Sequence, residues 1–251
     1  MLRLRQLVLA ATDLGAAVAD LRGVLAAGEP YRDPGVATFG LVNAVLAAGG
    51  DFVEVVSPSG AGTAVSRWIE RHGGDGGYML MVDGPPGLLD RTRLAELDVR
   101  VVHEVVLPDV TDLHLHPKDV GGVVLALDTV DPPGSWRWAG PSWTPPFDTG
   151  HPPYARGGLR SVVLAVDDPP ATAQRWAAVL DLPLAGDTRL HLDGGQAVQF
   201  VERAGPGAGP GAGPHAGLGI VAATITLPVS RPTRSVVAGV TFDVIPLEEP
   251  A

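Results

Sequence analysis

The sequence predicts an α+β fold in which tandem β-α-β-β-β modules form open, cup-shaped mixed sheets with helices on the outside. Three observations support this fold class. A strand followed by a helix opens the chain, and a similar strand and helix recur after residue 157. Runs of short strands follow these openings. The 251 residues include 33 Gly and 24 Pro, which break the chain into many short elements.

The repeat is clearest in two short segments, residues 6–14 (QLVLAATDL) and residues 161–168 (SVVLAVDD). Each is an apolar strand pattern that ends in an acidic turn. An Ala-rich stretch with apolar residues at helical spacing comes next in both copies. Asp13 and Asp168 are suited to the helix N-cap position. Internal repeats of this kind indicate a modular architecture.

The remaining elements follow from apolar runs and the turns between them. The first module is expected to have strands over 37–41, 44–48 and 52–56, and a linking helix over 63–71. The second module is expected to have a strand over 78–82, a helix over 88–97, and strands over 99–106, 112–116 and 122–127. The third module begins near 159 and continues with strands over 189–192 and 197–202, and a fourth, without a helix, has strands over 220–227 and 236–245.

This pattern divides the chain into three parts. Residues 1–130 are expected to form one domain of two modules, and residues 157–251 a second, degenerate domain. Residues 131–156 between them are rich in Trp and Pro. Disordered linkers are usually poor in aromatic residues, so we expect an ordered strap whose tryptophans pack on the domains. A role as an aromatic pocket wall is the alternative. Residues 205–217, rich in Gly and Pro, are expected to form a flexible surface loop.

Composition narrows the function classes. A net charge of −10 argues against nucleic acid as a partner. The absence of cysteine excludes disulfides and thiolate chemistry, and it is consistent with a cytoplasmic location. No apolar run approaches the roughly 20 residues of a membrane span, and the apolar run near the N-terminus is too short for a signal peptide.

Three motifs carry a resemblance to a known superfamily. Residues 53–58 (VEVVSP), 68–71 (WIER) and 113–123 (LHLHPKDVGGV) resemble the vicinal oxygen chelate superfamily, which includes glyoxalases, bleomycin-resistance proteins and dioxygenases. Residues 1–130 are most similar to its methylmalonyl-CoA epimerase type. The resemblance implies that two modules pair their sheets into a cup. It also implies a divalent metal, held by a first-strand and a last-strand residue of each module.

Transferred to this chain, the resemblance supplies only half of a metal site. The first module provides Gln6 and Glu54 as candidate metal ligands. In the second module the matching positions are Gly77, or Tyr78 if the register slips by one, and Ala126. Gly and Ala have no ligating side chain, and two ligands seldom hold a catalytic divalent ion. If a metal binds, Zn, Ni, Co, Mn or Mg is expected; the other expectation is that none binds.

Glu54 is the candidate catalytic residue because a carboxylate in so apolar a strand is costly unless paired, ligated or exposed. The alternative is an outward-facing Glu54 on a half-exposed strand. His114, His116 and Tyr78 are the candidate binding residues. The two histidines are expected on one strand face, near His103, where they could complete a nonstandard metal site. Alternatively, His116 forms hydrogen bonds in a turn.

Three functions follow from these residues. The first is a glyoxalase-like protein that binds a small molecule in the cup without a complete metal site, with Gly77 and Ala126 leaving room for it. The second is a divalent-metal-dependent isomerase, lyase or epimerase acting on a substrate with vicinal oxygens. The third is a structural or dimerisation module. Expected partners are a small-molecule ligand and a second copy of the chain, in a homodimer.

Overall fold

The structure is a computed structural model that describes residues 1–141, 143, 157–184, 188–204 and 217–247. Residues 205–216 of the expected loop and most of the strap after residue 141 lie outside the described residues. The elements of residues 1–130, with 3-10 helices written as η, are β1 (Arg3–Ala10), α1 (Leu14–Leu25), η1 (Pro34–Phe39), β2 (Leu41–Ala48), β3 (Asp51–Pro58), α2 (Ala64–His72), β4 (Gly76–Asp83), η2 (Pro86–Leu89), α3 (Arg91–Glu96), β5 (Val101–Leu107), β6 (Val110–Leu115), η3 (Pro117–Asp119) and β7 (Val124–Val130).

The rest of the chain repeats the strand and helix opening once. Its elements are η4 (Arg137–Ala139), β8 (Gly158–Val166), α4 (Pro169–Leu180), β9 (Arg189–His191), η6 (Asp193–Gly195), β10 (Ala197–Glu202), β11 (Gly219–Leu227), β12 (Thr233–Val237) and β13 (Val240–Pro246). The expected α+β class of β-α-β-β-β modules in open mixed sheets is confirmed. No helix among these described residues is long and apolar enough to cross a membrane.

The strands form two similar sheet halves. The first half, which we call the first cup, has the order β2-β3-β1-β4-β7-β6-β5, and the second cup has the order β9-β10-β8-β11-β13-β12. In each module the first strand pairs in parallel with the last, as β1 does with β3 and β4 does with β7. The two cups meet where Ile220 of β11 pairs with Gly77 of β4. The proposed domain boundaries at 130 and 157 stay a prediction.

Alternate side chains of β1 pack into two different hydrophobic cores, because successive side chains of a strand point to opposite faces of the sheet. Leu7 and Leu9 join a large core shared with the second cup, which includes Val162 and Phe200. The intervening Val8 joins a smaller core on the concave face of the first cup. Both faces of β1 are therefore covered, and the whole strand is buried.

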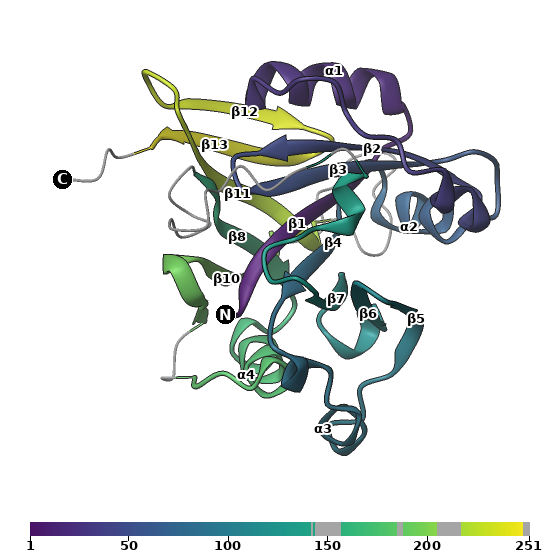
Figure 1. Cartoon of the computed structure of the whole chain (residues 1–251), viewed down its shortest axis with the longest axis vertical. Coiled ribbons are helices and arrows are strands. Elements are labelled where there is room, and N and C mark those ends of the chain that lie inside the picture. Colours follow the sequence, from purple (N-terminus) through teal and green to yellow (C-terminus); the bar gives the residue numbers. More distant parts are fainter. Residues whose placement is uncertain (142, 144–156, 185–187, 205–216, 248–251) are drawn as a thin grey trace.

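Two helices, α1 and α4, contact both cups. Helix α1 packs against β2 and β3 of its own module and also against β12 and β13 (Figure 1). It therefore covers the module that has no helix of its own. Helix α4 packs on β8 and β10, and its Trp176 donates a hydrogen bond of 2.7 Å to the backbone oxygen of Val120 in the first cup. This shared use of helices explains how the shortened fourth module buries its apolar face.

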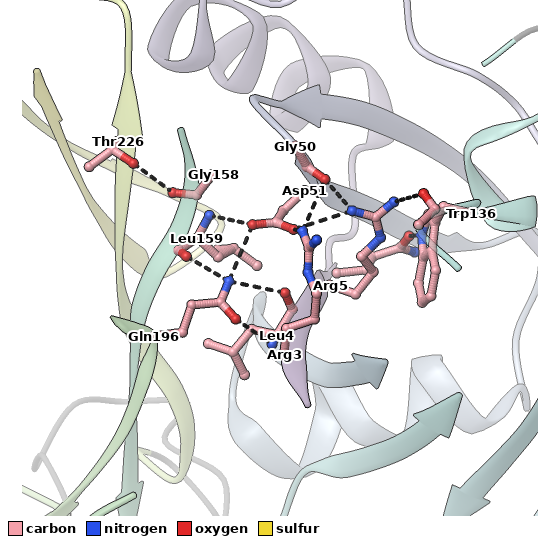
Figure 2. Close-up of polar contacts among 12 residues, drawn as sticks. Arg3, Leu4, Arg5, Gly50, Asp51, Trp136, Gly158, Leu159, Gln196 and Thr226 are labelled. Atoms are coloured by element: carbon pink, nitrogen blue, oxygen red, sulfur yellow. Dashed lines mark hydrogen bonds and ion pairs between the residues drawn. The ribbon is translucent and has the colours of Figure 1, made fainter. Parts of the chain in front are cut away.

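Asp51 joins the two cups through a buried polar network (Figure 2). Its Oδ2 accepts hydrogen bonds from the Leu159 backbone nitrogen, at 2.9 Å, and from Gln196 Nε2, at 3.3 Å. Its Oδ1 pairs with Arg3 and lies 3.5 Å from the Nη1 of Arg5. Because both arginines come from β1 and Leu159 from β8, this single carboxylate ties together strands that are distant in sequence.

One expected strand in the first cup is wrong, and another begins earlier than expected. Residues 37–41 do not form a strand, because Asp33 caps η1, Pro34 occupies its first turn and Gly40 ends it in a left-handed conformation. The strand expected at 44–48 begins earlier, at Leu41. Asn43 therefore lies inside β2 rather than between two strands.

Two further elements are shorter than expected. The helix expected over 88–97 is η2 followed by a short α3, because the backbone of Asp90 is extended and its side chain caps the second helix. The strand expected over 236–245 is a hairpin of β12 and β13. Its two-residue turn, Ala238-Gly239, has positive φ at both positions, as tight hairpins require.

Candidate functional site

The concave face of the first cup holds a cavity of about 670 Å³. It is lined mainly by apolar side chains of β1 to β4, with residues of β5 and β6 closing one side. The lining residues are Gln6, Val8, Asp33, Gly35, Val36, Thr38, Phe39, Leu41, Asn43, Val45, Glu54, Val56, Ala64, Val65, Tyr78, Met79, Met81, Val102, His103, Val105, Asp112, His114, Val124 and Trp138. Gln6, Glu54, Tyr78 and His114 of the predicted site residues are therefore brought together.

Glu54 lies in the middle of β3 and is only 8% exposed, so it is not an outward-facing surface residue. Its Oε1 accepts a hydrogen bond of 2.7 Å from Asn43 Nδ2. Its Oε2 accepts one of 2.7 Å from Gln6 Nε2. A buried carboxylate needs such donors, because an unpartnered charge in an apolar cavity is strongly disfavoured.

Both amides that hold Glu54 are themselves held in one orientation. The indole nitrogen of Trp136 donates to Gln6 Oε1 at 2.7 Å. The backbone nitrogen of Asp33 donates to Asn43 Oδ1 at 2.9 Å. Each amide oxygen is thus occupied by a donor, which leaves each NH₂ group pointing at the carboxylate. The site is preorganised around an acceptor at position 54.

Burial raises the pKa of Glu54 from 4.5 to about 7, although the hydrogen bonds from Asn43 and Gln6 lower it. The carboxyl group therefore changes its protonation state near neutral pH. A group with this behaviour in a cavity can anchor a polar ligand atom or exchange a proton with it.

The residues at this position do not fit the divalent metal that the resemblance implies. A metal ion beside Glu54 would meet the NH₂ group of Gln6, which has no lone pair to offer, because Gln6 Oε1 is directed at Trp136 instead. The described residues contain no group of three or more His, Cys, Asp or Glu placed to hold an ion. The polar atoms of Gln6 and Glu54 bind each other and the strap instead.

The two predicted histidines lie in different places. His114 lines the cavity, and its Nε2 lies 2.8 Å from Asp112 Oδ2. The ring of His103 lies 5.0 Å from that of His114, between ring centroids. His116 lies after the end of β6 and outside the cavity lining, where its Nδ1 accepts from the backbone of Lys118 at 3.1 Å. The two histidines therefore do not share the cup face, and His116 caps η3.

Tyr78 lines the cavity, but Gly77 does not leave room for a ligand. A Cβ atom added at Gly77 would lie 2.6 Å from the backbone oxygen of Ile220 in the second cup. Gly77 therefore allows the two cups to approach each other. Ala126 is fully buried in the concave core and is not part of the cavity lining.

Two carboxyl groups face each other at the β6 and β7 end of the cup. Asp112 and Asp128 are directly opposite in the strand register, and both are buried. Trp138 of the strap donates to Asp128 Oδ1 at 2.9 Å. Burial and the neighbouring Asp112 raise the pKa of Asp128 well above its ordinary value. Asp128 is therefore a buried residue although it lies near the end of its strand.

The sequence did not identify Asn43 or Asp112 as site residues. Asn43 was not recognised because it falls between the expected strands 37–41 and 44–48, whereas it lies inside β2 in the structure. The signal available was a single amide residue within the apolar run 41–48. Asp112 was placed at the start of a strand, where an exposed carboxylate is ordinary. Only the pairing of β6 with β7 places it opposite Asp128.

Several solved structures are similar to this chain in fold. A hypothetical protein from Staphylococcus aureus is similar over 98% of this chain and 100% of its own length, with a TM-score of 0.64 and 11% identity. Two methylmalonyl-CoA epimerases are similar at 22% identity and a TM-score of 0.44. The match with the Mycobacterium tuberculosis enzyme covers 51% of this chain and 88% of the enzyme. The match with the Streptomyces coelicolor enzyme in complex with 2-nitronate-propionyl-CoA covers 52% of this chain and 95% of the enzyme. No protein-family model and no curated protein matches. The full-length likeness to the Staphylococcus aureus protein shows that the two proteins share a fold.

Proposed function

We propose that the first cup binds a small, largely apolar molecule, with Glu54 as its polar anchor and without a divalent metal. The observation that carries this proposal is the cavity of about 670 Å³ around Glu54. Its volume lies within the range of about 300–1,000 Å³ that is common for small-molecule sites. Its lining combines many apolar side chains with a few polar ones, which is the usual composition of such sites.

Titration with 1-N-phenylnaphthylamine, a neutral dye that fluoresces in apolar surroundings, tests the proposal. Val45 lines the cavity, so Val45→Phe should fill part of it. Val163→Phe makes the same change on β8 of the second cup, outside the cavity. We expect saturable binding by the wild type and by Val163→Phe, and at least about tenfold weaker binding by Val45→Phe. Equal binding by all three proteins would contradict the proposal.

The metal-dependent isomerase, lyase or epimerase remains the alternative function. It requires Gln6 Oε1 to leave the indole of Trp136 before it can face an ion. Thermal unfolding of protein prepared without metal, with and without added Zn, Ni, Co, Mn or Mg, separates the two functions. We expect no increase in Tm that depends on Glu54. An increase in the wild type that Glu54→Ala removes would favour the alternative. The homodimer stays a prediction, which light scattering tests.

A further inference from the structure

The described lining of the cavity has three acidic side chains and no Lys or Arg. The acidic residues are Asp33, Glu54 and Asp112, and His103 and His114 also line the cavity. We infer that the ligand is a protonated primary or secondary amine with an apolar body. This inference rests on the proposed function and deepens it, since it names the chemical class that the cavity selects.

Asp112 supplies the clearest evidence for a donor on the ligand. It is 2% exposed, and its Oδ1 has no hydrogen-bond partner among the described residues. Its other oxygen, Oδ2, lies 2.8 Å from His114 Nε2. A buried carboxylate oxygen without a donor is costly, and an ammonium N–H is a donor well suited to it. A quaternary ammonium has no N–H and cannot supply this bond.

Asp112, rather than its neighbour Asp128, is the carboxyl group of this pair that lines the cavity. Asp128 is fully buried, whereas Asp112 lines the cavity. Two carboxylates opposite each other in a sheet are not both ionised readily. Burial and the neighbouring Asp112 raise the pKa of Asp128 well above its ordinary value.

Aromatic side chains extend the preference for a cation. Phe39, Tyr78 and Trp138 all line the cavity. The faces of such rings attract ammonium groups, and most strongly where water is excluded. The burial of Glu54 on the floor adds a second acceptor. A carboxylate or phosphate ligand would instead meet three acidic side chains and no Lys or Arg among the described lining residues.

Four probes with one phenylbutyl body test this inference by calorimetry at about pH 8, where an alkylamine is still protonated. They are 4-phenylbutylamine, its N,N,N-trimethylammonium analogue, 4-phenyl-1-butanol and 4-phenylbutyrate. We expect the amine to bind at least about tenfold more tightly than the alcohol, and the butyrate at least about tenfold more weakly. The trimethylammonium probe should lie between the amine and the alcohol.

Asp112→Asn provides the matched variant, with Asp243→Asn on β13 of the second cup as a control of equal charge change. Asp112→Asn should reduce the preference for the amine over the alcohol by about tenfold. Asp243→Asn should preserve the preference. If Asp112→Asn does not fold, the wild-type probe series still decides.

The outcomes separate the two claims. If the alcohol binds as tightly as the amine, the inference of an amine ligand fails and the proposed binding function stands. If the trimethylammonium probe equals the amine, the role of Asp112 as acceptor of an N–H fails. If none of the four probes binds, both the inference and the proposed function are contradicted.

Discussion

The indole nitrogen of Trp136 donates a hydrogen bond of 2.7 Å to the side-chain oxygen of Gln6. This contact fixes the Gln6 amide so that its nitrogen faces Glu54. A residue 130 positions away in sequence thereby determines how the floor of the cavity presents its carboxylate. The same contact removes Gln6 from the set of metal ligands. The strap and the proposed binding site are thus parts of one arrangement.

Trp136→Phe should destabilise the protein by about 1–3 kcal/mol beyond the loss of packing, because Gln6 Oε1 is left buried without a donor. Urea unfolding measures this change. Trp68→Phe is the matched control, since Trp68 is also buried and its indole nitrogen has no hydrogen-bond partner among the described residues. Equal losses in the two variants would show that the bond to Gln6 contributes nothing.

Glu54 should make the protein less stable as the pH rises towards neutral. The unfolded carboxyl loses its proton near pH 4.5, whereas the folded one keeps it until a pKa of about 7. The folded state therefore binds more protons between these values, so its stability is full below pH 4.5 and is lost as the pH rises through about 7. The expected loss is about 3 kcal/mol, at about 1.4 kcal/mol per pKa unit.

Glu54→Gln should remove this part of the pH dependence. Urea unfolding at a series of pH values measures it, with Glu70→Gln on the exposed face of α2 as the control. Asp83, whose pKa burial raises to about 6, acts in the same direction in every variant, so the difference between proteins isolates Glu54. An unchanged slope in Glu54→Gln would contradict the raised pKa.

Gly77→Ala should be destabilising because its Cβ would lie 2.6 Å from the backbone oxygen of Ile220. Overpacking of this kind typically costs about 1–3 kcal/mol. Gly23→Ala is the control, since a Cβ there, within α1, meets nothing within 4 Å. That change should stabilise the protein by up to about 1 kcal/mol. If Gly77→Ala were neutral, the two cups would not pack as closely as described.

Asp51→Asn should strongly destabilise the contact between the cups. It leaves the buried Arg3 and Arg5 without their carboxylate, and breaking such a pair costs about 3–5 kcal/mol. Asp109→Asn removes the exposed ion pair with Arg137 and should change the free energy of unfolding by no more than about 1 kcal/mol. Unfolding by urea compares them, and similar small losses would contradict the account of Asp51.

Much of the fold could be predicted from the sequence because strands and helices leave a periodic apolar pattern. The repeated opening and the helix beginning after Asp168 follow that pattern. The errors arose where two signals competed. Residues 37–41 are apolar enough for a strand, but the Asp33-Pro34 start and Gly40 favour a 3-10 helix.

The candidate site was only partly predictable, because its residues meet through pairing between distant strands. Glu54 and Gln6 could be identified, since polar residues within apolar strands are unusual. The roles of Asn43 and Asp112 depend on strand register, which periodicity does not determine. The contact of Trp136 with Gln6 depends on where the strap crosses the cup, and no local pattern encodes that position.

The central claim is that the cavity around Glu54 is a ligand site. A crystal of the wild-type protein soaked with 4-(4-bromophenyl)butylamine tests it most directly, because the bromine atom is located by its anomalous scattering. We predict one strong peak inside the cavity, near Met79 and Val45, with the amine directed at Asp112. An empty cavity at saturating concentration, or a peak only elsewhere on the molecule, would contradict the claim.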